Sequence, residues 1–117
     1  HLFSSAASDV YKRQAINHSH YASTKAGLLN LTVSSALELG KKNIRVNSIC
    51  PGLTERPGLK RDWPEGVKSW LDQAPLGRLC TGDDIANSTL FLVSEASSFI
   101  TGACITVDGG ISSVSAW

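Results

Sequence analysis

Apolar residues recur at steps of three and four between Ser19 and Leu39, and this spacing predicts an amphipathic helix. The stripe consists of Ala22, Ala26, Leu29, Val33, Ala36, Leu37 and Leu39. Gly40 follows at the position typical of a helix C-cap, and the two lysines after it suit the negative end of the helix dipole. The helix is therefore expected to end at Leu39.

Two short runs rich in β-branched residues predict strands, at residues 44–50 and 103–107. A turn signal stops each of them: Pro51-Gly52 after the first, and Asp108-Gly109-Gly110 after the second. The tail after Ile111 is expected to fray.

Two further helices are predicted between these strands. Pro64 suits the first turn of a short helix that reaches Gln73. Thr81 can cap a longer helix that ends near Ser94, with Asp83 and Asp84 at its positive end. Residues 53–63 hold proline, glycine and several charges, which indicates a mobile loop.

The order helix, strand, helix, helix, strand indicates crossover units, and hence an α/β fold with a parallel sheet. A parallel sheet is covered on both faces and needs more than two strands. We therefore expect the chain to be incomplete as a fold.

The pattern of the first 14 residues predicts neither a helix nor a strand. The chain opens with His1 instead of Met, and residues 1–14 are polar and mixed, with neither a helical nor a strand period. We expect either a longer protein cut at this point or foreign sequence joined on. Residues 15–117 are assigned to one domain.

Composition narrows the class of protein. The 117 residues are 42% hydrophobic and 18% charged, with a net charge of +1, so neither nucleic acid nor an anionic membrane is expected as a partner. No apolar run reaches about 18 residues, so no membrane span is expected. Cys50, Cys80 and Cys104 lack metal-ligand or redox spacing, which predicts three reduced thiols in a cytoplasmic protein.

Tyr21 and Lys25 are four residues apart on the first predicted helix, so both side chains leave the same face. Tyrosine in model peptides has a pKa of about 10, and a neighbouring ammonium favours the phenolate. Such a phenol can exchange a proton with an alcohol or carbonyl oxygen near neutral pH. A packed tyrosine beside a lysine of no catalytic importance is the alternative for this spacing alone.

Four motifs in order change that balance, because together they resemble the short-chain dehydrogenase/reductase family. The resemblance runs from about Ser19 to Gly110. It implies a Rossmann-type doubly wound parallel sheet, of which this chain would be the C-terminal half. The motifs are YASTKAGL at 21–28, IRVNSICPG at 44–52, PLGR with DIA at 75–78 and 84–86, and SSFITG with VDGG at 97–102 and 107–110.

The resemblance implies roles for individual residues. Tyr21 would be the general acid/base, and Lys25 would assist it and hydrogen-bond the nicotinamide ribose. Pro51, Gly52 and Thr54 would line the nicotinamide pocket of NAD or NADP. Family members commonly carry a threonine slightly later, where this chain has Arg56, so the contact to the carboxamide is left open.

The family also holds the substrate oxygen with a serine thirteen residues before the tyrosine, a spacing that points to Ser8. The family's serine follows an apolar strand, whereas residues 2–5 imitate that strand end three residues too early. Ser8 is therefore a candidate only if residues 1–14 are native.

Two readings of function remain. The first is an NAD(P)-dependent oxidoreductase that transfers hydride between nicotinamide and a small secondary alcohol or ketone, a dimer or tetramer when complete. The second is an inactive fragment or an oligomerisation module, because the glycine-rich turn that binds the pyrophosphate is missing.

Other candidates have plainer explanations. His18 and His20 lack a third metal ligand, so no metal is expected. Trp63 and Trp70 flank the predicted loop, where they either line a substrate pocket or pack as ordinary apolar side chains.

Overall fold

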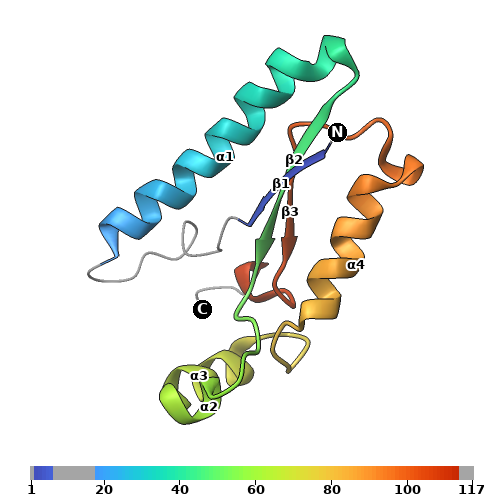
Figure 1. The fold of residues 1–117 in the computed structure, drawn as a ribbon. Helices are drawn as coiled ribbons and strands as arrows, with labels where there is room; N and C mark the ends of the chain where they lie inside the picture. Colours follow the sequence, from blue (N-terminus) through green and yellow to red (C-terminus); the bar gives the residue numbers. More distant parts are fainter. Residues whose placement is uncertain (1, 7–17, 114–117) are drawn as a thin grey trace.

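The computed structural model describes residues 2–6 and 18–113, which form a three-stranded parallel sheet with helices along it (Figure 1). The order of the strands is β1 (Leu2–Ala6), β2 (Arg45–Pro51) and β3 (Cys104–Val107). In the register, Ala6 lies opposite Ile49, and Pro51 lies opposite Val107. The predicted α/β class with a parallel sheet is confirmed.

Strand β1 lies inside the segment that the sequence pattern left unassigned. Its sequence, LFSSA, neither alternates nor forms a long apolar run, so periodicity gave no signal. Pairing with the edge of β2 makes it a strand, and this is a tertiary effect. The count of two strands was too low: the described residues hold three.

Helix α1 (Ser19–Leu39) has the predicted bounds. Gly40 is its C-cap, but in the right-handed conformation, and a 3-10 turn η2 (Gly40–Lys42) continues the chain. The left-handed residue is Asn43, with φ of 58°. Asparagine tolerates this region, so it ends the helical segment three residues later than the glycine suggested.

Helices α3 (Pro64–Gln73) and α4 (Gly82–Val93) also match the prediction. The segment 53–63, predicted as a mobile loop, contains a short helix, α2 (Leu59–Asp62), in which Leu59 is buried. Turn η3 (Glu95–Ser97) follows α4, and turn η4 (Ile111–Ser113) follows β3. Ile111 is almost fully buried, so the tail is still held by packing at this residue.

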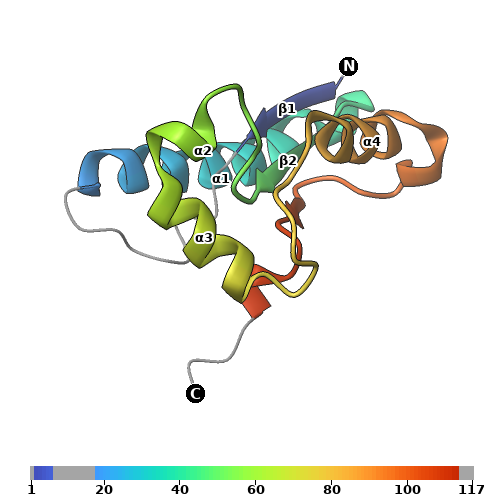
Figure 2. The same ribbon diagram turned by 90° about the horizontal axis from the view of Figure 1, so that it is seen from below.

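Helices α1 and α4 cover opposite faces of the sheet, and α2 and α3 lie beyond the carboxyl ends of β2 and β3 (Figures 1 and 2). Alternate residues of a strand point to opposite faces. On the α4 side, Asn47 is fully buried; its amide donates to the Ile100 carbonyl at 3.0 Å and accepts from the Ala103 backbone at 3.0 Å. These bonds join β2 to the segment between α4 and β3.

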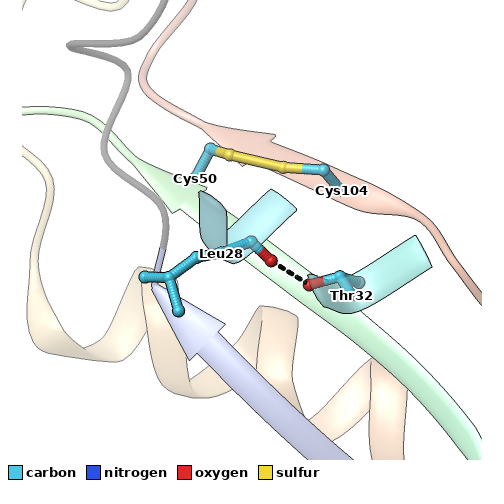
Figure 3. The surroundings of a disulfide bond; sticks show 4 residues. All are labelled: Leu28, Thr32, Cys50 and Cys104. Atoms are coloured by element: carbon cyan, nitrogen blue, oxygen red, sulfur yellow. Dashed lines mark hydrogen bonds between the residues drawn. A yellow bond between two sulfur atoms is a disulfide. The ribbon is translucent and has the colours of Figure 1, made fainter. Parts of the chain in front are cut away.

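The prediction of three reduced thiols is wrong for Cys50 and Cys104, which form a disulfide (Figure 3). The register places Cys104 opposite Ser48 and Cys50 opposite Thr106, so both cysteines lie on the same face of neighbouring strands, with Cα atoms 6.6 Å apart. A separation of 54 residues hid this proximity. The cysteines therefore no longer support a reducing compartment, and the cytoplasmic location stays a prediction.

Within the described ranges, no helix is long and apolar enough to cross a lipid bilayer.

Candidate active site

The predicted site residues gather toward one end of the sheet. Helix α1 begins near the carboxyl ends of the strands, and the turn after β2 opens at the same end (Figure 1). In open α/β sheets, ligands bind outside the carboxyl ends of the strands. Two groups of residues occupy this end: a pair on α1 and the turn at 51–54.

Tyr21 and Lys25 form a direct contact on the first turns of α1. The Lys25 Nζ atom lies 5.3 Å from the centroid of the Tyr21 ring, a cation–π geometry. Ala22, next to the tyrosine, is buried and fixes the side of the helix that faces the protein. Tyr21 keeps 36% of its surface exposed, so the residue is accessible from solvent. The sequence-predicted pair is brought together by the structure.

His18 precedes this pair, and its ring meets the Tyr21 ring edge-on at 6.4 Å between centroids. His18 and His20 are both exposed. Within residues 2–6 and 18–113, no group of three or more His, Cys, Asp or Glu side chains is placed to hold a metal ion. Ser8 lies outside the described residues, and its role stays a prediction.

The second group is the turn that follows β2. The Gly52 backbone N–H donates to the Val107 carbonyl at 2.9 Å, and the Thr54 hydroxyl donates to the Gly52 carbonyl at 3.1 Å. Backbone bonds from Glu55 N–H to the Cys80 carbonyl (2.8 Å) and from Cys80 N–H to the Leu53 carbonyl (3.0 Å) hold the next residues. The turn is thus hydrogen-bonded on both sides.

Arg56 stands where members of the family that the sequence resembles commonly have threonine, but its side chain is engaged within the loop. Its guanidinium donates to the Asp62 carboxylate at 3.0 Å and to the Pro57 carbonyl at 3.2 Å. The Arg56 and Arg61 guanidinium groups hold the pKa of Asp62 below its ordinary value. Thr54 is therefore the better placed of the two for a polar contact at the turn.

Gly52 is enclosed on two sides, which sequence reasoning did not anticipate. A Cβ atom at this position would lie 2.7 Å from Cζ2 of Trp70 and 2.8 Å from the Cα atom of Asp108. Only a residue without a side chain fits so close to backbone and indole. Asp108 follows β3 as Gly52 follows β2, and this shared position on neighbouring strands was the one available signal.

A cavity of about 640 Å³ lies beside Asp108, and Tyr21, Lys25 and the turn at 51–54 are not among its lining residues. Leu76, Arg78, Cys80 and Gly110 contribute to its wall. Burial raises the pKa of the Cys80 thiol. Asp108 therefore borders both the cavity and the turn at Gly52, whereas Tyr21 and Lys25 lie outside the cavity wall.

An ion pair fixes the start of α4 next to this cavity. Arg78 donates to both Asp84 oxygens, at 2.6 and 2.9 Å, and Asp84 also accepts from the Thr81 backbone and hydroxyl at 2.8 Å. The Thr81 hydroxyl in turn accepts from the Asp84 backbone N–H, which completes a capping box. The Arg78 guanidinium, followed by the Thr81 donors, holds the pKa of Asp84 far below its usual range.

Comparison with known proteins identifies the family. Residues 4–112 match a family model described as Enoyl-(Acyl carrier protein) reductase. L-xylulose reductase of Bos taurus is 41% identical over an alignment of 106 positions, which covers 89% of this chain and 43% of that protein. 3-oxoacyl-(acyl-carrier-protein) reductase of Chlamydia muridarum is 40% identical over 105 residues, 90% of this chain and 42% of that protein.

Solved structures agree with these relatives. A 7α-hydroxysteroid dehydrogenase, in complex with NADH and 7-oxo glycochenodeoxycholic acid, superposes with a TM-score of 0.87 at 40% identity, over 93% of this chain and 43% of that one. A putative 2-deoxy-D-gluconate 3-dehydrogenase from Agrobacterium tumefaciens with bound NADP gives a TM-score of 0.89 at 32% identity, over 97% and 47%.

The chain belongs to the short-chain dehydrogenase/reductase family. It spans less than half of the length of the relatives it matches.

Proposed function

We propose that this chain carries the proton-transfer half of an NAD- or NADP-dependent oxidoreductase, which interconverts a small secondary alcohol and its ketone. The observation that carries the proposal is the contact between Tyr21 and Lys25 on one face of α1. Two structural neighbours have NADH or NADP bound, which supports a nicotinamide cofactor. The relatives named above are called an L-xylulose reductase, a 3-oxoacyl-(acyl-carrier-protein) reductase and a 7α-hydroxysteroid dehydrogenase, which supports a carbonyl or hydroxyl substrate.

Tyr21 would act as the general acid in ketone reduction and as the general base in alcohol oxidation. Its hydroxyl passes a proton to the carbonyl oxygen or takes one from the alcohol oxygen. The Lys25 ammonium beside the ring offsets the negative charge that the phenol gains when it releases the proton. The same ammonium would also hydrogen-bond the nicotinamide ribose.

The turn at 51–54 is suited to one side of a nicotinamide. Pro51 and Gly52 present no polar side chain, and both are half-buried at the carboxyl end of β2. The half-buried Thr54 hydroxyl is a polar group at the same turn. Nicotinamide, when bound, supplies or accepts the hydride, while the protein provides position and a path for the proton.

The test is turnover by the Tyr21→Phe variant of the purified protein. NADH and NADPH are each paired with L-xylulose, a 3-oxoacyl thioester and a 7-oxo bile acid. Loss of a positioned general acid lowers kcat by roughly 100- to 10,000-fold. The phenyl ring preserves packing, so affinity for the cofactor is expected to stay within a factor of about two. Ser23→Ala, an exposed change on the same helix, is the control and keeps wild-type activity.

Tyr21→Phe with wild-type turnover would remove the tyrosine from the mechanism.

A second candidate, an oligomerisation module without activity, is favoured by apolar side chains on the surface. Leu31, Leu37, Leu90 and Phe99 are exposed, Phe99 completely. Where exposed apolar side chains form a contiguous patch, they can be covered by a partner in a larger assembly. Self-association without turnover for any of the three carbonyl compounds would favour this candidate over the enzyme, and a homo-oligomer with turnover is compatible with the first proposal.

A further inference from the structure

Trp70 lies between the apolar cluster of the α2–α3 segment and the turn that follows β2. The residue lies near the end of α3, where its backbone carbonyl accepts the Ala74 N–H at 2.8 Å. The Cζ2 edge of its indole lies within 2.7 Å of the point where a Gly52 Cβ would stand, so it covers one side of the turn after β2. The Asp108 backbone covers the other side.

The indole is held in this position by the apolar face of the α2–α3 segment. Val67, one turn earlier on α3, is buried together with Leu59 of α2 and Leu79. Leu53, Trp70 and Leu71 pack against this cluster. The cluster thus joins the α2–α3 segment to the turn on which Gly52 lies, and Trp70 is the member that touches Gly52.

We propose that Trp70 is a positioning residue for the nicotinamide side of the site. It presses Gly52 against the end of β3, preserves the bond between the Gly52 N–H and the Val107 carbonyl, and so sets where Pro51 and Gly52 face the cofactor. Any shift of the α2–α3 segment is passed to the cofactor pocket through this contact. The proposal rests on the proposed function, since it assumes that the turn faces nicotinamide.

The test compares Trp70→Ala, Trp70→Phe and Leu71→Ala in the purified protein. Leu71 packs on the same cluster but is not among the atoms nearest to a Gly52 Cβ, so its removal reports the loss of packing alone. The readouts are the KM and Kd for NADH and NADPH, kcat, and amide exchange at Gly52. Misplacement of a binding element by a fraction of an ångström is costly, and about a tenfold rise in the KM for the cofactor is expected for Trp70→Ala.

Three results support the proposal together. The KM for the cofactor rises in Trp70→Ala with a smaller change in kcat, Gly52 exchanges faster, and Leu71→Ala moves neither quantity even where it lowers stability. Trp70→Phe, which keeps an aromatic edge, retains a KM within about threefold of wild type. Phenylalanine also keeps the variant folded if alanine does not.

Equal KM and equal Gly52 exchange in Trp70→Ala and wild type, with cofactor still bound, would overturn the positioning role alone. Calorimetry that detects no binding of NADH or NADPH to the wild-type protein would overturn the proposed function, and this inference with it.

Discussion

At the scale of the residue, the absence of a side chain is as informative as its presence. Gly52 and Gly27 are indistinguishable as letters in a sequence, yet one is enclosed and the other open. A Cβ at Gly52 would meet Trp70 and Asp108 below 3 Å, whereas nothing lies within 4 Å of a Cβ at Gly27. Replacement by alanine should therefore change the free energy of unfolding in opposite directions at the two positions.

Gly52→Ala is expected to lower the free energy of unfolding by about 1–3 kcal/mol, because the new methyl group overpacks against backbone that cannot rotate away. Gly27→Ala, in the exposed interior of α1, is expected to raise it by up to about 1 kcal/mol through helix propensity. Urea denaturation of the two variants and wild type measures both. A Gly52→Ala variant as stable as wild type would mean that the turn has room to move.

Among the individual site residues, Tyr21 and Lys25 could be predicted because local spacing determines their contact. Helical periodicity places residues four apart on one face, whatever the rest of the protein does. Thr54 and Arg56 could not be separated in this way. Their hydrogen bonds, from Arg56 to Asp62 and from Thr54 to the Gly52 carbonyl, depend on how this irregular segment folds, which no repeating spacing predicts.

At the scale of the element, the start of α4 is stabilised both by its own cap and by a contact with the preceding loop. The sequence predicted that Thr81 caps the helix and that acidic residues stabilise its first turn, and the capping box confirms this. The pairing of Asp84 with Arg78 adds a contact between the helix and the preceding loop. Asp84 therefore stabilises the cap and the loop together.

Asp84→Asn is expected to lower the melting temperature at pH 7, because it removes the charge that Arg78 and the helix start attract. The pKa of Asp84 is lowered in the folded state from an ordinary value of 3.8. A lowered pKa stabilises the fold above the unfolded value and loses this effect as pH falls through the folded value. The difference between wild type and variant should thus be full above about pH 4 and shrink in more acidic solution.

Thermal unfolding between pH 2 and pH 7 measures this difference. Asp83→Asn removes the neighbouring carboxylate of the same first turn without touching the Arg78 contact, and it is expected to have the smaller effect at every pH. A gap between wild type and Asp84→Asn that stays constant down to pH 2 would contradict the assignment.

At the scale of the whole molecule, the disulfide joins strands whose cysteines are 54 residues apart. Cys50 is the residue before the Pro51–Gly52 turn, and Figure 3 shows the bond beside the part of α1 that carries Leu28 and Thr32. A covalent link between β2 and β3 closes a long loop, which restricts the unfolded chain.

Reduction of this bond, or the substitution Cys104→Ser, is expected to lower the free energy of unfolding by about 2–4 kcal/mol. Urea denaturation with and without reductant measures the change, and reductant should have no further effect on Cys104→Ser. In denaturant without reductant, thiol titration should find one thiol, Cys80, and three after reduction. Three thiols before reduction would show that the disulfide does not form.

The sequence by itself determined what depends on near neighbours in the chain: the bounds of α1, α3 and α4, the strands β2 and β3, and the Tyr21–Lys25 pair. These follow from periodicity, caps and turn residues, which act over a few positions. Tertiary structure alone decided the strand at residues 2–6, the Cys50–Cys104 bond and the contact of Trp70 with Gly52. Each of these joins residues that are distant in sequence. Their pairing follows from strand register and packing, which the local pattern of apolar and polar residues does not predict.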